Sequence, residues 1–169
     1  MVKPADWVLT QNETSSIDQV LIQAKEKGLR VAFNPAPMTE SVKHLPLECI
    51  DLLIVNEVEA EEISGRKDLD KIEAYFRQDW PNTEVLITLG KAGVRMLKKD
   101  KTIDVPAFEV DAVDTTAAGD TFIGYFLSAY SEHTDSKTAL IRACAASALA
   151  VMKIGAAQSI PNKEDVNRF

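Results

Sequence analysis

The feature that most constrains the fold of this chain is a regular alternation of short apolar runs with stretches of helical periodicity. Apolar runs of about four to eight residues that are bounded by turn residues are typical of buried strands. Strands that alternate with helices form βαβ units, whose strands pair in parallel. We therefore predict an α/β fold with a mostly parallel sheet and helices on both faces. The predicted strands are residues 7–10, 29–33, 50–55 and 85–90.

Helices are predicted where apolar residues recur at helical spacing between the strands. Ser15 or Ser16 is the predicted cap of the first helix, and Ser136 is the predicted cap of the last. Residues 93–98 and 101–105 are predicted to form a β-hairpin around Lys99 and Asp100. The predicted helical segments are residues 16–27, 39–44, 59–63, 68–80 and 138–152, and a helix that begins near Ala118 or Gly119.

Polar residues follow the predicted strands at their carboxyl ends, which is the edge of a parallel sheet where ligands bind. Because these ends meet along one edge, we expect the side chains that follow them to lie near one another. The residues concerned are Asn12 and Glu13, Asn34, Asn56 and Glu59, Thr88 and Gly90, and the loop before Asp120.

The most distinctive of these loops is residues 113–122, in which small residues separate Asp114 from Asp120. Backbone N–H groups at the start of the following helix lack helical partners, so small side chains there would let a phosphate group approach them. Asp120 in the first helical turn could then take a proton from a hydroxyl group that attacks the phosphorus. The alternative is structural: Asp120 caps the helix and Gly119 eases a tight turn.

Residues 114–122, Asp-Thr-Thr-Ala-Ala-Gly-Asp-Thr-Phe, resemble the C-terminal signature of the ribokinase family of sugar and nucleoside kinases, the phosphofructokinase-B type. The resemblance implies an ATP-dependent sugar kinase in which Asp120 deprotonates a primary hydroxyl of a pentose. It also implies that the backbone N–H groups of Ala117, Ala118 and Gly119 stabilise the transferring phosphoryl group. Asn34-Pro35-Ala36-Pro37 resembles ribokinase most closely, and Glu13 matches a family glutamate that reaches the sugar.

Two further motifs resemble the parts of the family that bind Mg²⁺ and ATP. Asn56-x-x-Glu59 after a buried strand resembles the family motif that organises Mg²⁺, largely through water, and the phosphates. Its alternative is a helix N-terminus with favourable acidic residues. Thr88, Gly90 and Gly93 resemble the family loop that lines the phosphates and ribose of ATP. Their alternative is a turn between strand and hairpin in which glycines allow positive φ.

A potassium ion is also implied by the resemblance, since residues 153–159 match the family loop that binds one. This chain departs from the usual pattern, because Gln158 falls one place later and no proline precedes Ser159. The alternative is a helix that ends at a glycine and continues into a loop. Carried over by position, the K⁺ ligands are Asp114, Thr116, Ala150, Lys153, Gly155 and Ser159.

Composition narrows the function classes. The formal net charge of −7, with no basic run to offset it, argues against nucleic acid and anionic membranes as partners. The longest apolar run, residues 143–152, is too short to span a membrane. The N-terminal residues lack the apolar core of a signal peptide, and Cys49 and Cys144 lack metal-ligand spacing. We predict a cytoplasmic protein.

The resemblance covers nearly all of the 169 residues, but only the C-terminal half of the family. The family's Gly-Gly signature, which lies in the first half, has no counterpart here. Residues 1–169 are therefore interpreted as the nucleotide-binding and catalytic part of a longer fold. The sequence does not distinguish a truncated gene product from an expressed fragment or from one piece of a longer protein. A nucleotide-binding module without turnover is the alternative function. A sheet cut through its middle would expose a strand edge, which predicts self-association, as a homodimer.

Overall fold

The computed structural model describes residue 3 and residues 6–169. The N-terminal stretch on which the signal-peptide argument rests thus lies partly outside the described residues. The chain forms two compact units. The first unit extends to Thr88 and includes Arg95–Ile103, and the second unit combines Leu89–Val94 with Asp104–Phe169. We describe each unit by itself.

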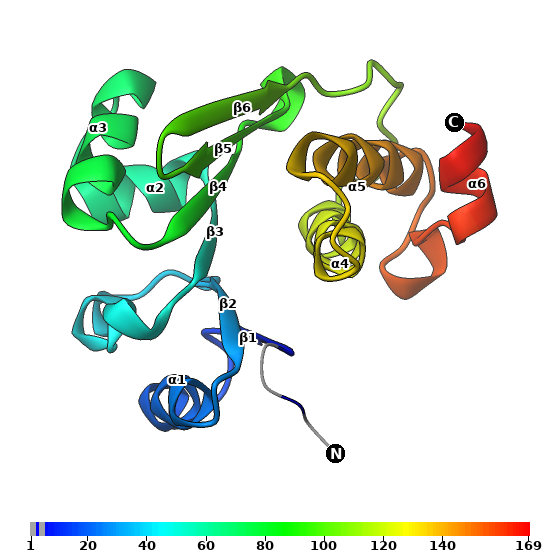
Figure 1. The fold of residues 1–169 in the computed structure, drawn as a ribbon. Coiled ribbons are helices and arrows are strands. Elements are labelled where there is room, and N and C mark those ends of the chain that lie inside the picture. The colour runs from blue at the N-terminus through cyan, green and yellow to red at the C-terminus, as the bar shows by residue number, and fades with distance from the viewer. Residues whose placement is uncertain (1–2, 4–5) are drawn as a thin grey trace. The chain divides into compact units, whose positions relative to one another are not determined.

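Six strands form one sheet, in which the strands follow one another in chain order (Figure 1). The first four strands pair in parallel, and the last two are joined by two residues, a connection that only an antiparallel pair can have. The prediction of an α/β fold with a mostly parallel sheet is confirmed. The strands are β1 (Trp7–Gln11), β2 (Arg30–Asn34), β3 (Leu52–Asn56), β4 (Glu84–Thr88), β5 (Val94–Lys98) and β6 (Lys101–Val105).

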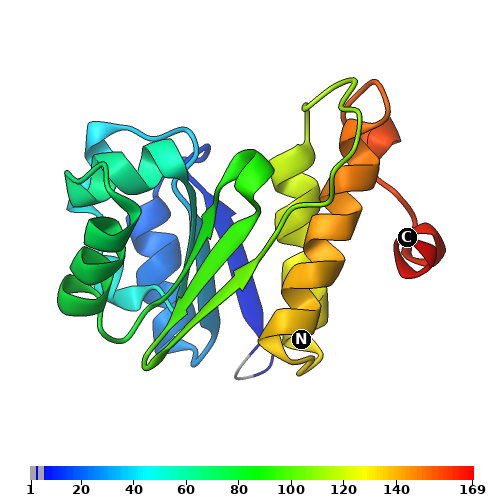
Figure 2. The ribbon, with the colours of Figure 1, turned by 90° about the horizontal axis from the view of Figure 1, so that it is seen from above.

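Three helices of the first unit cover the same face of strands β1 to β4, as Figures 1 and 2 show. They are α1 (Ile17–Glu26), α2 (Glu57–Ser64) and α3 (Leu69–Asp79), and the short 3₁₀ turns η1 (Glu40–His44) and η2 (Leu47–Cys49) precede β3. Phe33, Leu53 and Ile87 of the central strands are buried, as are Leu21 of α1 and Phe76 of α3. The apolar runs of the sequence therefore form the core of this unit.

A partly buried ion-pair network fixes α3 against the hairpin of β5 and β6. The Arg77 guanidinium pairs with Glu73 at 2.9 Å and donates to the carbonyl oxygens of Lys98 and Lys99. Burial alone would raise the pKa of Glu73, but hydrogen bonds from Thr102 and Arg77 and the nearby guanidinium charges outweigh it and lower the pKa. The network is structural and lies away from the carboxyl ends of the parallel strands.

The second unit consists mainly of two long helices that lie side by side, α4 (Ala118–Ser131) and α5 (Ser136–Val151). Alanine occupies much of the buried face of α5, which allows the close approach of α4. A short C-terminal helix, α6 (Lys163–Arg168), packs Val166 against Ala145 and Ala146. The unit also contains the 3₁₀ turns η3 (Gly90–Ala92) and η4 (Ala157–Ser159).

Three local predictions need correction. The cap of α5 is Asp135, whose Oδ1 accepts from the N–H groups of Lys137 and Thr138, and Ser136 is the first helical residue. Ser16 does precede α1, but it lies in the left-handed region and makes no side-chain cap bond. The helix that ends at Val151 is not the last one, because α6 follows it.

Within the described part of the chain, every helix is too short or too polar to cross a membrane.

Candidate active site

In the first unit, the residues predicted to organise Mg²⁺ form a capping box at the start of α2. The backbone N–H of Glu59 donates to Asn56 Oδ1, and the N–H of Asn56 donates to Glu59 Oε2, both at 2.9 Å. Burial raises the pKa of Glu59, partly offset by the bond from Asn56. The structural alternative for this motif is thus realised. It does not exclude the metal role, because each residue presents further oxygen lone pairs of the kind that Mg²⁺ prefers.

Strand register brings several predicted site residues to one edge of the first unit. Asn56 pairs with Thr88 between β3 and β4, and Gln11 pairs with Asn34 between β1 and β2. Glu13, the predicted sugar contact, is exposed in the turn after β1. The expectation that these strand ends share an edge is therefore met within this unit.

Sequence reasoning did not find the side-chain bonds along this edge. Gln11 Nε2 donates to Asn34 Oδ1 at 3.0 Å, and Asn34 Nδ2 donates to the carbonyl oxygen of Ile54 at 2.8 Å. The available signal was two amides at equivalent ends of neighbouring strands, which suits a hydrogen-bonded pair.

In the second unit, the turn between β4 and β5 needs glycine at Gly93. Its φ is 104°, and an added Cβ would overlap the carbonyl oxygen of Val105 and lie 2.7 Å from the nitrogen of Ala107. Gly90 also has a positive φ, of 54°, but its Cβ would enter open space. The backbone of Leu89 and Gly93 closes the turn with a bond of 2.8 Å. The close approach of backbone to backbone requires glycine at position 93.

Also in the second unit, the small-residue loop forms a tight turn at the start of α4. Ala117 precedes the helix with a φ of 59°, in the left-handed region that non-glycine residues seldom adopt. Asp120 is exposed in the first turn of the helix, as predicted. The Asp120 side chain therefore lies on the surface beside this turn.

The predicted phosphate contacts of this loop differ from one another. The N–H of Ala118 donates to the carbonyl oxygen of Thr115 at 3.2 Å, so in this structure it closes the turn and is not offered to a ligand. Among the described residues, the N–H groups of Ala117 and Gly119 have no carbonyl partner. Two of the three predicted donors are thus available at the helix N-terminus.

Asp114 ties this loop to the chain that follows α5. Its Oδ1 accepts from the N–H of Thr116 and its Oδ2 from the N–H of Gly155, both at 2.9 Å. Hydrogen bonds from the Thr116 side chain, the Gly155 N–H and the Thr116 N–H lower the pKa of Asp114 to about 2. Three of the six predicted K⁺ ligands, Asp114, Thr116 and Gly155, are therefore neighbours.

The other three predicted K⁺ ligands lie at or after the end of α5. The carbonyl oxygen of Ala150 accepts from Lys153, as in a helix C-terminus. Ser159 is fully buried, and its Oγ donates to the carbonyl oxygen of Ala156 at 2.7 Å. The described residues contain no group of three or more His, Cys, Asp or Glu side chains that could hold a metal. A K⁺ site made largely of carbonyl oxygens would not depend on such a group.

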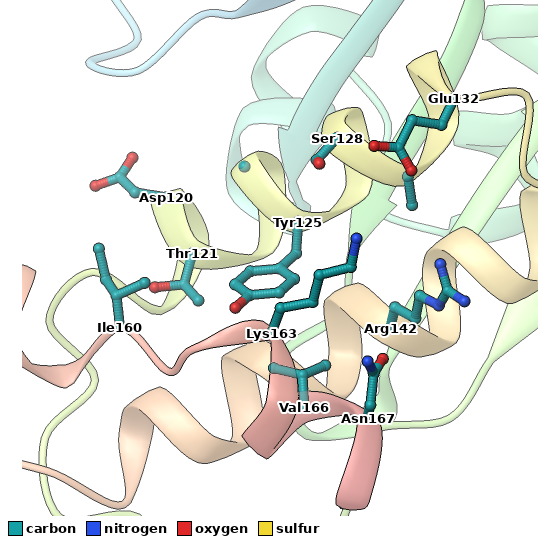
Figure 3. Close-up of a pocket in the computed structure, with 12 residues that line it drawn as sticks. Asp120, Thr121, Tyr125, Ser128, Glu132, Arg142, Ile160, Lys163, Val166 and Asn167 are labelled. Atoms are coloured by element: carbon teal, nitrogen blue, oxygen red, sulfur yellow. The ribbon is translucent and has the colours of Figure 1, made fainter.

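A cavity of about 340 Å³ runs along α4 in the second unit (Figure 3). Asp120 lies at one end, and Glu132 and Arg142 lie at the other. Thr121 lines it, is 3% exposed, and has the one buried side-chain oxygen without a hydrogen-bond partner among the described residues. Because the cavity extends from Asp120 toward the C-terminal end of the helix, it runs away from the small-residue turn.

The sequence matches a protein-family model and curated relatives. The model of the pfkB family of carbohydrate kinases matches residues 5–163. A protein of Staphylococcus aureus named ribokinase is 40% identical over an alignment of 172 positions, which covers 97% of this chain and 56% of the relative. The chain thus spans about half the length of the curated relatives that it matches.

Solved structures agree with this result. The structure of ribokinase from Thermotoga maritima has a TM-score of 0.81 and 35% identity, and the match covers 96% of this chain and 56% of that one. The structure of Arabidopsis thaliana ribokinase complexed with ribose and ATP has a TM-score of 0.84 and 29% identity, over 96% of this chain and 55% of that one.

Proposed function

The chain belongs to the pfkB family of carbohydrate kinases, and from this premise we propose that residues 1–169 are the nucleotide-binding and catalytic part of an ATP-dependent sugar kinase. It transfers the terminal phosphoryl group of ATP to a primary hydroxyl of a sugar. Ribose is the sugar we expect, because similar proteins are named ribokinase. The observation that carries the proposal is the tight turn before α4, with two available N–H groups and Asp120 beside them.

Asp120 is the proposed general base. Its carboxylate takes the proton of the sugar hydroxyl while the hydroxyl oxygen bonds to the terminal phosphorus. The bond from that phosphorus to the bridging oxygen breaks, and ADP leaves. The N–H groups of Ala117 and Gly119 stabilise negative charge on the transferring group, while Ala118 holds the turn.

ATP and Mg²⁺ are the proposed cofactors. Thr88, Gly90 and Gly93 line the nucleotide, and the turn that the Leu89–Gly93 bond closes supports this role. Asn56 and Glu59 supply oxygen atoms that would hold Mg²⁺ through its water molecules, and the ion would neutralise charge on the phosphates. The oxygen-rich capping box is compatible with this role.

K⁺ is a further proposed cofactor, held by Asp114 and the backbone near Thr116 and Gly155, with Ala150, Lys153 and Ser159. The low pKa of Asp114 supports a carboxylate that stays ionised, as a cation ligand must. Such an ion would orient the loop before α4 and would not touch the substrate. Glu13 is the proposed sugar contact.

A nucleotide-binding module without turnover is the second candidate. It is favoured by one observation, that the chain spans about half the length of its relatives.

We also propose that the chain self-associates, as a homodimer, through the edge of β1. Cytoplasmic location and the absence of nucleic-acid partners stay predictions.

Calorimetric titration with Mg-ATP, followed by a ribose-dependent assay of ADP release, tests the proposal. We expect binding and turnover in the chain as it is, and retained binding with turnover lower by about two orders of magnitude or more in Asp120→Asn. Glu132→Gln, which alters another carboxylate, at the C-cap of the same helix, is the matched control and should turn over normally. Binding without turnover in the unaltered chain would favour the module, and near-normal turnover in Asp120→Asn would remove Asp120 from the role.

A further inference from the structure

Asn34 bridges a place where backbone pairing between two strands stops. The ladder between β2 and β3 pairs Ala32 with Leu52 and Phe33 with Leu53. One residue later, the Asn34 side chain takes over and donates to the carbonyl oxygen of Ile54 at 2.8 Å. Its Oδ1 accepts from Gln11 Nε2 at 3.0 Å. One side chain therefore joins the carboxyl ends of three strands.

The chemistry of this position requires an amide. Gln11 offers a donor and Ile54 offers an acceptor, so the residue between them must accept on one side and donate on the other. Asn34 is 7% exposed, and a buried polar group that lost either partner would be left unsatisfied. Asp would accept but not donate while ionised, and Leu of similar volume would do neither.

The segment that begins at Asn34 also holds the loop after β1. The N–H of Asn12 donates to the carbonyl oxygen of Ala36 at 3.0 Å. The Asn12 amide donates to the carbonyl oxygen of Pro37 at 2.8 Å and to Thr39 Oγ1 at 3.0 Å. Glu13 follows directly in this loop, and Asn56 lies two residues beyond Ile54.

We propose that Asn34 is a positioning residue that sets the loop carrying Glu13 and the capping box of Asn56 and Glu59 relative to one another. It touches neither substrate nor cofactor and acts through its two hydrogen bonds. The functional side of this inference, that it aligns a sugar contact with a Mg-ATP contact, rests on the proposed function.

Backbone amide hydrogen exchange tests the positioning without any ligand. In Asn34→Leu, we expect the N–H groups of Asn12 and Asn56 to exchange about tenfold faster or more, because their loops lose a common support. The matched control is Thr83→Val, which removes a comparable bond, from Thr83 Oγ1 to the carbonyl oxygen of Ile50 at 3.0 Å, at the opposite edge of the sheet. It should leave both rates within about twofold of the unaltered chain.

Exchange at Asn12 and Asn56 that is no faster in Asn34→Leu than in Thr83→Val would overturn the proposal. If Asn34→Leu does not fold, Gln11→Leu decides, because it removes the bond on the β1 side and leaves Asn34 bonded to Ile54. Faster exchange at Asn12 with Asn56 unchanged then supports the proposal, and no change at either position contradicts it.

Ligand affinity separates this proposal from the kinase assignment. We expect Asn34→Leu to raise the dissociation constants for Mg-ATP and for ribose by about fivefold or more, and Thr83→Val to leave them within about twofold. Failure of the unaltered chain to bind Mg-ATP would defeat the proposed function, while the exchange rates would still decide the role of Asn34. Normal affinities in Asn34→Leu, despite fast exchange, would show that the support is structural only.

Discussion

Gly93 shows how a single missing Cβ fixes a turn. Both its positive φ and the neighbouring backbone of Val105 and Ala107 exclude a side chain. We expect Gly93→Ala to lower the free energy of unfolding by about 3 kcal/mol or more, since strain and backbone overlap add. Gly65→Ala is the control: its φ of 67° is also left-handed, but an added Cβ meets nothing within 4 Å, so about 1 kcal/mol is expected. Equal losses in urea unfolding would mean that the overlap is relieved by a small shift.

Asp114 makes stability depend on pH in a defined direction. Its pKa is lowered to about 2 in the folded chain, so the ionised form stabilises the fold above the unfolded pKa of about 4. That contribution is lost as the pH falls through the folded pKa. The unaltered chain should therefore exceed Asp114→Asn in stability at about pH 5, and the gap should close toward about pH 2.

Urea unfolding of both proteins across this pH range measures the gap. Other carboxylates titrate in both proteins and cancel in the difference to first order. A gap that does not change with pH would show that Asp114 acts through packing and not through its charge.

Among the elements, α2 combines a structural cap with the proposed metal ligands. Because burial raises the pKa of Glu59, ionisation of this side chain costs stability as the pH rises, and the protonated form is favoured at low pH. Glu59→Gln keeps an oxygen that accepts from the N–H of Asn56. We expect it to be at least as stable as the unaltered chain at about pH 7, with the difference vanishing below about pH 4.

Glu59→Ala serves as the comparison, because it removes the cap bond and should cost about 1 kcal/mol. Unfolding by urea measures all three proteins, and calorimetry measures their affinity for Mg-ATP. If Glu59→Gln is stable but binds Mg-ATP weakly, then the carboxylate is kept for the ligand and not for the helix. A Gln variant that loses as much stability as the Ala variant would refute the capping argument.

Patterns that repeat along the chain predicted the elements well, and single contacts were missed. Periodicity located the strands and the long helices, because an element that buries one face has apolar residues at a regular spacing along the chain. The cap of α5 was misassigned because Asp135 and Ser136 are adjacent and equally suited to the role. Helix α6 was missed because it is too short to be stable without the packing of Val166 against α5. A local signal was available in Asn162, the N-cap residue, whose side chain accepts from the N–H of Asp165.

The candidate site divides in the same way. The loop before α4 and the polar strand ends could be located from the sequence, because small residues precede a helical pattern and polar residues follow apolar runs. The sequence did not predict which backbone N–H groups of the loop are hydrogen-bonded within the protein, because the bond from Ala118 to Thr115 depends on the left-handed geometry of Ala117. The bridge from Gln11 through Asn34 to Ile54 depends on strand register, which the sequence indicates only through the two amides at the ends of neighbouring strands.

For the whole molecule, β1 is the strand from which self-association is expected. Among the described residues it pairs with β2 only, and Leu9 is 45% exposed on it. An unpaired strand edge with an apolar side chain favours pairing with another chain. Sedimentation should therefore show a mass that rises with concentration, and Leu9→Lys should shift the protein toward monomer.

Val58→Lys is the matched control, because Val58 is also an exposed apolar residue, at 62%, but lies on α2. It should not alter the mass. A stable monomer in the unaltered chain, or an equal effect of the two lysines, would argue against association through β1.

The bond from Asp114 to Gly155 joins residues 41 positions apart and closes the chain around α4 and α5 into a loop. The start of α4 and the end of α5 are thereby fastened together, and the connection at His133 and Thr134 forms the far tip. An insertion at that tip, such as an affinity tag or a fluorophore, would lengthen the connection without loosening the fastened end. The tip is accordingly a place where the chain can acquire new sequence without disturbing the bond between Asp114 and Gly155.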